Sequence, residues 1–381
     1  MGASTLYSLV HSATPPQSLT LIEAASTVAP GASGKSGGFL ARDWHGPATS
    51  SIADLSFRLH RELAERDNGR EKWGYRDVET LSVEFDSAKT RNKAPKAIQD
   101  WVDGKHVSRS SVMGGSGSTA QATPLPLVEH LVESSKSKAA EKGIDLNVLL
   151  NTYATKANLD AGGSTIESVT VEPSNGGGES QTLPCTDVVL SAGPWMGSLV
   201  NSLFPRNFIS SHRFLTSASY IDGSRAHSIV VRGTRPASNH CLFTEMSYGN
   251  HKAAAPEVYA RSDGTVYICG GSDDVPLPRL AEEVDPDLKK TKALIEQTAA
   301  LSPEVLAPDA GAKVERQQAC YLPVGSRSNL IVSGDKSSGV WVGGGGASCW
   351  GITLSLGVGH CMAELMLEGK IKSAEDRMLR G

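Results

Sequence analysis

The sequence has few aromatic residues and little charge bias. Phe, Trp and Tyr make up 6% of its 381 residues, and 37 basic against 41 acidic side chains leave a formal net charge of −4. Single-stranded nucleic acids are bound by aromatic stacking in basic grooves, and acidic membrane surfaces attract basic patches. We therefore expect a small molecule, and no nucleic acid, as the main partner. The composition does not define an oligomeric state.

Long apolar runs and a leader-like start are also missing. No apolar stretch approaches the roughly 18 residues of a transmembrane helix, and no charged segment followed by an apolar core marks a signal peptide. We expect no membrane span and a cytoplasmic protein. A targeting signal that preceded Met1 would change the expected cytoplasmic location.

The cysteines and histidines show no metal-ligand spacing. The six cysteines, at 185, 241, 269, 320, 349 and 361, include no C-x-x-C pair, and the ten histidines include no H-x-x-x-H pair. Zinc sites and redox motifs depend on such spacings. We expect reduced thiols and no metal site.

Glycine, by contrast, is abundant, at 39 of 381 residues, against an average usage of about 7%. It follows no G-x-y period, which excludes a collagen-like fibre. The 39% of hydrophobic residues is enough for a buried core, and the length favours two or three domains. Many of the glycines are concentrated in two segments, 31–38 and 343–359.

Apolar spacing predicts helices and strands that alternate around a β-rich middle. Helices are expected over 2–10, 52–67, 124–142, 287–300 and 352–368. Strands are expected over 18–23, 145–150, 187–190, 214–221, 227–232, 256–260, 265–270, 330–332 and 340–342, with a hairpin over 162–183. This order predicts an α/β nucleotide-binding domain built from discontinuous segments, together with an α+β second domain.

The first 23 residues match the later part of a dinucleotide-binding unit. That unit consists of a strand, a G-x-G-x-x-G turn, a helix, a second strand and an acidic residue for the ribose. Gly2 opens the predicted helix, and Glu23 ends the following strand 21 residues later. We expect the first strand to be missing from this sequence, either because a longer chain supplies it or because it is lost. An ordinary surface helix and strand is the alternative.

The loop GASGKSGG, 31–38, carries two misleading patterns. Its Gly34-Lys35-Ser36 is similar to the end of a P-loop, but Ala29 stands where that motif needs glycine. Residues 34–38 fit G-x-S-x-G, but no strand leads into them as a nucleophile elbow requires. An NTPase and a hydrolase are therefore disfavoured. Backbone amides that line a phosphate or a ring are the favoured interpretation.

Two further segments are candidates for contact with a cofactor. Residues 187–195, DVVLSAGPW, form a strand that ends in small residues, which would let a planar ligand approach; a tight turn is the alternative. Residues 343–359, GGGGASCWGITLSLGVG, open a helix. A helix N-terminus carries about half a positive charge, which would favour an anionic reduced ring. A glycine hinge or helix contact is the alternative here.

The order of these motifs resembles one family. Glu23 after a strand, the 31–38 loop, STAQ at 118–121 before Pro124, 187–195 and ASCWGIT at 347–353 are together similar to D-amino-acid oxidase-like FAD-dependent oxidoreductases, in the branch of sarcosine and glycine oxidases. The 31–41 segment with Asp43-Trp44, and the segments EVY at 257–259 and DGTVYICG at 263–270, look most like a fungal subgroup of oxidoreductases. The resemblance covers essentially the whole chain.

The resemblance implies a Rossmann-like FAD-binding domain over 1–60, 112–210 and 311–381, and a mixed-sheet substrate domain over 61–111 and 211–310. Gly2 would be the last fingerprint glycine, Glu23 would bind the adenosine ribose, and the pyrophosphate and ring edge would meet Ser33, Gly34, Lys35, Ser36, Gly37 and Gly38. The remaining cofactor contacts would be Ala154 and Thr155 near the adenine, Ala192, Gly193 and Trp195 along the cofactor, and Ser348, Cys349, Trp350, Gly351, Ile352 and Thr353 at the pyrimidine end of the flavin.

The resemblance also raises the question of a covalent flavin. Cys320 occupies a place similar to that of the cysteine joined to flavin in the sarcosine oxidase branch. A buried strand cysteine without a covalent bond is the favoured alternative. Candidates to act on the substrate are Trp350, Arg42 and Arg213, with His45 and His227 as further partners for a carboxylate.

The resemblance implies an enzyme that oxidises a C–N bond of an amino acid or secondary amine. Hydride would pass from the substrate carbon to the flavin N5, and no protein acid or base is required. The alternative is a family member with little turnover that serves as an interaction or intracellular trafficking factor.

Overall fold

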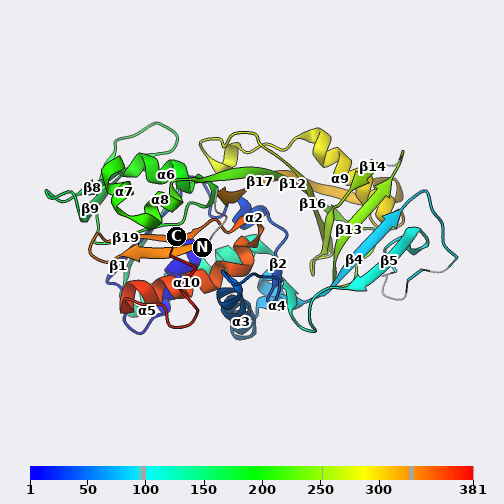
Figure 1. The fold of residues 1–381 in the computed structure, drawn as a ribbon, viewed down its shortest axis with the longest axis horizontal. Helices are drawn as coiled ribbons and strands as arrows, with labels where there is room; N and C mark the ends of the chain where they lie inside the picture. Colours follow the sequence, from blue (N-terminus) through cyan, green and yellow to red (C-terminus); the bar gives the residue numbers. More distant parts are fainter. Residues whose placement is uncertain (93, 96–99, 251, 326–329, 381) are drawn as a thin grey trace.

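The computed structural model describes residues 1–92, 94–95, 100–250, 252–325 and 330–380. Its longer helices are α1 (Gly2–His11), α3 (Ser50–Asp67), α5 (Pro124–Lys142), α6 (Met196–Leu203), α9 (Leu288–Leu301) and α10 (Gly351–Glu368). Its shorter ones are α2 (Ala32–Lys35), α4 (Gly69–Trp73), α7 (Arg206–Ser211) and α8 (Arg213–Ala218). Figure 1 shows two lobes side by side, with both ends of the chain in the lobe that contains α1, α5 and α10.

Short parallel strands form the centre of this first lobe. Strand β1 (Ser18–Ile22) pairs in parallel with β7 (Asp145–Leu149). Strand β19 (Val340–Gly345) pairs in parallel with β11 (Val188–Leu190) and antiparallel with β18 (Ile331–Asp335). Within the described ranges, no ladder joins β1 to β11, β18 or β19. Helix α1 begins near both groups: a Cβ at Gly2 would lie 3.4 Å from Ser191 Cβ, just after β11, and 4.0 Å from Leu21 Cδ1 in β1.

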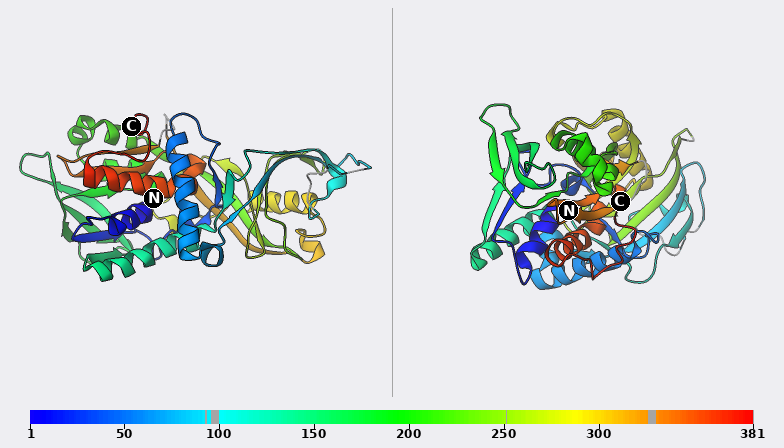
Figure 2. Two further views of the ribbon diagram at one scale, coloured as in Figure 1. Left: turned by 90° about the horizontal axis from the view of Figure 1, so that it is seen from below. Right: turned by 60° about the vertical axis from the view of Figure 1, so that its left-hand side comes forward.

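Helices and a second small sheet cover these strands. Helix α10 packs on α1 and α3, and α1 packs on α5; Figure 2 shows α3 standing at the junction of the two lobes. Gly359 of α10 lies directly on the backbone of Ser4 in α1, which only a residue without Cβ permits. An antiparallel sheet of β8 (Thr152–Leu159), β9 (Ile166–Pro173) and β10 (Gln181–Pro184) lies at the far end of the lobe.

An eight-stranded sheet dominates the second lobe. Its order is β17 (Lys313–Gly325), β12 (Ile221–Arg232), β16 (Thr265–Asp273), β15 (Glu257–Ala260), β13 (His240–Tyr248), β4 (Glu79–Asp86) and β5 (Val107–Val112), with β14 (Lys252–Ala254) beside β13. A smaller sheet, β2 (Phe39–Ala41), β6 (Thr119–Gln121) and β3 (Arg76–Asp77), lies between the lobes.

The two faces of the large sheet differ. Alternate residues such as Leu242, Val258 and Ile268 belong to a core cluster that also contains Leu294 of α9. Because side chains alternate along a strand, their neighbours Cys241, Tyr259 and Tyr267 lie on the other face, where they contact Phe39 of β2. This second face carries the candidate site.

Most strongly periodic elements are confirmed. The expected helix over 124–142 has the bounds of α5, and the expected hairpin is β9–β10. The expected strand over 214–221 is wrong: Arg213–Ala218 is helix α8, because Phe214, Leu215 and Ala218 are buried together at helical spacing. Strands β13 and β17 were not expected. The 31–38 loop, expected without a helix, contains the single turn α2.

The mixed α/β class with a discontinuous first lobe agrees with the expected fold. The domain limits given above remain a prediction, and β17 lies in the large sheet. One described helix, Ser348–Glu368, has the length and composition to cross a membrane, but 56% of that window is buried in the protein, as in a core helix. The length and composition of this helix are therefore only weak support for a membrane-spanning segment.

Candidate functional site

Five aromatic rings from separate segments meet between the two lobes. Phe39 lies 5.4 Å from Phe243 and 5.4 Å from Tyr259, between ring centroids. Trp44 lies 5.1 Å from Phe243 and 6.5 Å from Trp350. We call Phe39, Trp44, Phe243, Tyr259 and Trp350 the aromatic cluster. It joins β2 and the loop after it, the large sheet, and the 3-10 turn Ser348–Trp350 that leads into α10.

A carboxylate lies beside this cluster. The Tyr259 hydroxyl donates a hydrogen bond to Glu257 Oε2, and the Cys269 thiol donates to the same oxygen at 3.6 Å. Burial, reinforced by the Glu257 carboxylate, raises the pKa of Cys349. Glu257 therefore lies on the sheet face that is turned toward the start of α10.

The Ser33–Gly38 loop rests on the same sheet. Arg261 Nη2 donates to the Ser36 carbonyl oxygen at 3.0 Å, and Gln318 Nε2 donates to the Lys35 carbonyl oxygen at 2.7 Å. A Cβ at Gly37 would lie 2.4 Å from Tyr259 Cδ2. Glycine at this position is what allows the loop backbone to lie against the ring.

The loop region has polar groups that fit the FAD implied by the resemblance. Ser36 Oγ and Arg261 Nε are buried and have no partner among the described residues. Burial lowers the pKa of Arg261, and no described carboxylate lies within ion-pair distance of it. A buried cation without an anion is costly, so a bound anionic group would complete this site. The pyrophosphate or the reduced flavin ring would supply one.

The start of α10 also fits a cofactor. Gly351, its first residue, has nothing within 4 Å of the position of a Cβ. The first amides of an 18-residue helix have no partner within the helix, and their dipole favours negative charge. Thr353 is buried and ties this turn to β2, because its hydroxyl donates to the Phe39 carbonyl oxygen at 3.1 Å. Ser348 adopts φ +48°, and Ile352 is half-buried.

The residues expected at the adenosine end also come together. Glu23 follows β1, accepts a hydrogen bond from Ala25 N at 3.0 Å, and has its pKa raised by burial. Thr152 N donates to the Glu23 carbonyl oxygen at 3.0 Å, so β8, which carries Ala154 and Thr155, starts beside Glu23. Thr155 Oγ1 donates to the Thr170 carbonyl oxygen.

The segment after β11 is partly occupied by protein contacts. Gly193, with φ +55°, has open space at the position of a Cβ, and Ala192 is half-buried beside it. Trp195 donates its Nε1 hydrogen to the Pro278 carbonyl oxygen at 2.7 Å.

Two other glycines of the 31–38 loop lie against protein backbone. A Cβ at Gly34 would meet the Ala29 carbonyl group, and a Cβ at Gly38 would meet the Ala122 carbonyl group.

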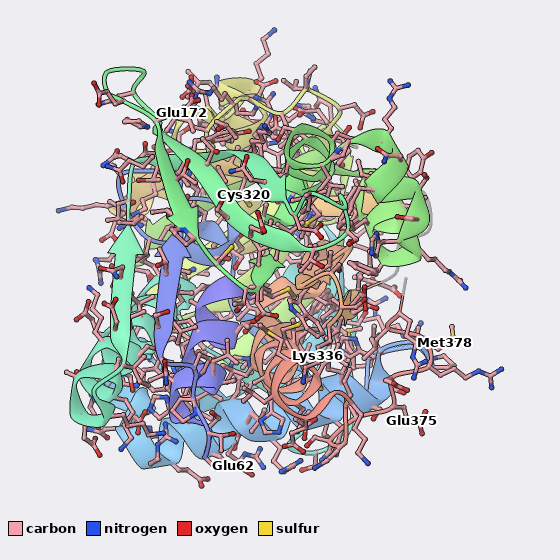
Figure 3. The ribbon with its side chains drawn as sticks, turned by 90° about the vertical axis from the view of Figure 1, so that its left-hand side faces the viewer. Glu62, Glu172, Cys320, Lys336, Glu375 and Met378 are labelled. Atoms are coloured by element: carbon pink, nitrogen blue, oxygen red, sulfur yellow. The ribbon has the colours of Figure 1, made fainter. Side chains whose placement is uncertain are left out.

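Cys320 is buried on β17. Figure 3 labels it within the molecular outline, whereas Glu62 and Glu375 lie at the edge. Burial raises the pKa of its thiol to about 11, and Lys35 opposes this only in part. The thiol is therefore protonated near neutral pH.

The structure separates the residues expected to act on the substrate. Trp350 belongs to the aromatic cluster, and His45 lies 4.5 Å from its ring, with burial lowering the pKa of that histidine. Arg42 is exposed and 3.9 Å from Asp54. Arg213 is exposed at the start of α8. His227 is buried and lies 3.8 Å from Asp273, outside the aromatic cluster.

Sequence reasoning missed Glu257, Tyr259 and Phe243. The segment EVY contributed to the resemblance, but no role was expected for its residues. The available signal was Glu257 itself, an acidic residue in the otherwise apolar strand 257–260. Because side chains alternate between the two faces of a sheet, Glu257 and Tyr259 share a face, and a charged group on such a strand is unusual.

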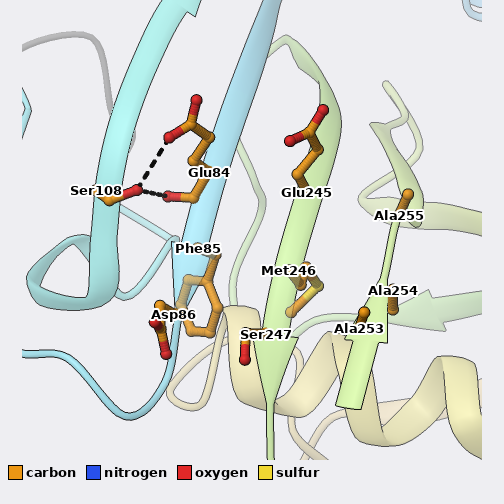
Figure 4. Close-up of a pocket in the computed structure, with 10 residues that line it drawn as sticks. All are labelled: Glu84, Phe85, Asp86, Ser108, Glu245, Met246, Ser247, Ala253, Ala254 and Ala255. Carbon is orange, nitrogen blue, oxygen red and sulfur yellow. Dashed lines mark hydrogen bonds between the residues drawn. The ribbon is translucent and has the colours of Figure 1, made fainter. Parts of the chain in front are cut away.

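An open hollow of about 610 Å³ lies elsewhere on the large sheet. Figure 4 shows it on β4, β13 and the β14 segment, where Ser108 Oγ donates to the Glu84 carbonyl oxygen at 3.2 Å. It shares no residue with the aromatic cluster. Over the described ranges, no group of three or more His, Cys, Asp or Glu side chains is arranged to hold a metal ion.

Comparison with known proteins agrees with this geometry. Residues 1–365 match the DAO family, described as FAD dependent oxidoreductase. "Putative oxidoreductase C1F5.03c" of Schizosaccharomyces pombe is 33% identical over 385 residues, which is 99% of this chain and 94% of that protein. "Putative oxidoreductase TDA3" of Saccharomyces cerevisiae is 25% identical, and the alignment covers 98% of this chain and 91% of the length of that protein.

Solved structures share the fold. Glycine oxidase from Geobacillus kaustophilus superposes with a TM-score of 0.71 at 14% identity, over 98% of this chain and 94% of its own. Iminodiacetate oxidase from Chelativorans sp. BNC1 gives a TM-score of 0.71 at 15% identity, and the superposition covers 99% of this chain and 95% of the iminodiacetate oxidase chain. The expected fold class is thus confirmed, and the chain belongs to the DAO family of FAD-dependent oxidoreductases.

Proposed function

We propose that this FAD-dependent oxidoreductase oxidises a C–N bond of an amino acid or a secondary amine. The observation that carries the proposal is the aromatic cluster with Glu257, which lies between the large sheet and the start of α10. Such a site can enclose a small organic ligand against a flavin ring. The names of the structural neighbours, glycine oxidase and iminodiacetate oxidase, support the same class of reaction.

The chain offers groups for each part of FAD. Glu23 would accept hydrogen bonds from the ribose hydroxyls. Ser36 and Arg261 would meet anionic oxygens beside the 33–38 loop. The first amides of α10, at Gly351 and Ile352, would stabilise negative charge at the pyrimidine end of the ring.

FAD held by these groups would supply the hydride acceptor for the substrate carbon, and water would hydrolyse the resulting imine to a carbonyl compound and ammonia, or an amine where the substrate is a secondary amine. The side chains of the site bind, orient and shield the substrate. Phe39, Phe243 and Trp350 exclude water from the reacting carbon, and Glu257 Oε1 can hold the proton that leaves the ammonium group before oxidation. Thr353 keeps the start of α10 against β2, so that the two walls of the site hold their spacing.

An absorbance spectrum of the purified protein tests the proposal. We expect a flavin spectrum, either directly or after addition of FAD, and bleaching of the flavin by members of an amine and amino-acid panel under anaerobic conditions. Glu23→Gln should weaken FAD binding about tenfold, because it removes the charge from the ribose contact. A folded, colourless protein that takes up no FAD would contradict the proposal and favour the interaction or trafficking factor.

A further inference from the structure

We propose that Glu257 binds the ammonium group of the substrate, and that the site therefore prefers amines that carry no carboxylate beside the reacting nitrogen. This inference rests on the proposed function and narrows its substrate class. It concerns a residue to which the family match assigns no role.

The hydrogen bonds of Glu257 leave one of its oxygens available. Both the Tyr259 hydroxyl and the Cys269 thiol donate to Oε2. No described group donates to Oε1, and Glu257 has no ion pair within the described part of the chain. Tyr259 is buried on the same strand and Cys269 lies opposite Glu257 in the sheet register, so the carboxylate is held in place from within the sheet. Oε1 can therefore accept a hydrogen bond from a ligand.

Two residues of the aromatic cluster lie next to this carboxylate in the sheet. Phe243 lies opposite Glu257 in the register of β13 and β15, and Tyr259 follows two residues later on the same face. Trp350 extends the cluster from the side of α10 through Trp44. Faces of aromatic rings attract ammonium groups, and a carboxylate adds a charge-assisted hydrogen bond. A carboxylate and aromatic rings at one site favour a cation.

The charges that the described residues place around this site do not favour a substrate carboxylate. In the described residues, no lysine or arginine forms a cation–π contact with a ring of the aromatic cluster. Arg261 lies on the other side of Tyr259, stacked 5.1 Å from the centroid of Tyr267 and bonded to Ser36 O. It is directed to the cofactor loop. A substrate carboxylate beside Glu257 would meet a like charge instead, which is unfavourable.

Benzylamine and phenylglycine test the proposal, because phenylglycine is benzylamine with a carboxylate on the reacting carbon. Calorimetric titration of the FAD-loaded protein under anaerobic conditions should show at least about tenfold tighter binding of benzylamine. Glu257→Gln should weaken benzylamine binding about tenfold or more and reduce the difference between the two ligands. Glu245→Gln, an exposed glutamate two residues after Phe243, is the matched control and should leave both affinities unchanged.

Equal or tighter binding of phenylglycine would overturn the inference, as would an unchanged benzylamine affinity in a folded Glu257→Gln protein. The comparison of the two ligands on the unaltered protein needs no variant, so it decides the matter even where Glu257→Gln does not fold. Flavin bleaching by phenylglycine and not by benzylamine would overturn this inference while the proposed function stands. Lack of FAD binding would contradict the proposed function instead, and calorimetry with the two ligands would still test Glu257.

Discussion

His60 Nε2 of α3 donates a hydrogen bond to the Ile352 carbonyl oxygen in the first turn of α10, at 2.9 Å. The direction follows from chemistry, since a carbonyl oxygen only accepts. His60 Nδ1 is buried and has no described partner. A proton added there would be placed in an apolar interior without an acceptor. The contact thus fixes both the neutral state of the ring and the position of the helix that opens the candidate site.

Stability should fall between pH 6.5 and about 4 because of His60. Burial lowers the pKa of His60 from 6.5 to about 4 in the folded protein, whereas the unfolded chain takes up a proton near 6.5. The unfolded state therefore binds more protons in this window, and acidification favours it. Urea unfolding should show about 2 kcal/mol lost by pH 5 from this residue. His60→Gln cannot titrate, so its loss between pH 7.5 and 5 should be smaller; equal losses would contradict the assignment.

Thr353→Val should destabilise the contact between α10 and β2. The substitution keeps the shape of the buried side chain but removes the hydroxyl that donates to the Phe39 carbonyl oxygen at 3.1 Å. The expected loss is about 1–2 kcal/mol in the free energy of unfolding, measured by urea titration. Thr353→Ser retains the hydroxyl and should lose less. A serine variant weaker than the valine variant would show that the methyl group, and not the hydrogen bond, matters.

Gly359→Ala should weaken the packing of α10 on α1. The new Cβ would lie 2.4 Å from the Ser4 carbonyl carbon and oxygen, and a packed backbone cannot move aside cheaply. We expect a loss of about 1–3 kcal/mol by thermal or urea unfolding, despite the better helix propensity of alanine. Gly351→Ala is the matched control in the same helix, because nothing lies within 4 Å of its Cβ position. It should leave stability unchanged and lower FAD affinity.

Flavin should be released when the protein is precipitated with acid. The attacking species in thiol chemistry is the thiolate, and burial holds the pKa of Cys320 at about 11. We therefore expect non-covalent FAD, with all the yellow colour in the supernatant. Cys320→Ala should give the same result. Colour that stays with the precipitate of the unaltered protein, and is lost from that of the alanine variant, would show a covalent bond.

Elements with strong local patterns were predictable. The helix over 124–142 starts at a proline and ends at Gly143, which adopts φ +69°, and both signals are local. Strand β1 with Glu23 at its end could likewise be read from apolar spacing and one acidic residue. Arg213–Ala218 was misassigned because six residues with three aromatic or branched side chains are ambiguous between helix and strand.

Pairing between distant strands could not be predicted. Strand β13 lies between β15 and β4, which are far apart in the chain. A local pattern shows that a strand has an apolar face, but it does not show which strand lies beside it. The role proposed for Glu257 depends on this pairing, because the pairing places Phe243 opposite Glu257.

The sequence by itself determined the family of this protein, through the order of Glu23, the glycine-rich loop and the segment before α10. These motifs are local: each consists of adjacent residues whose backbone conformation follows from small side chains and helix ends. Only the tertiary structure brings Phe39, Glu257 and Trp350 together, and only it places Arg213 and His227 outside the aromatic cluster. Residues more than 200 positions apart meet there because the large sheet and α10 pack across the lobes, a property of the whole chain that no local pattern encodes.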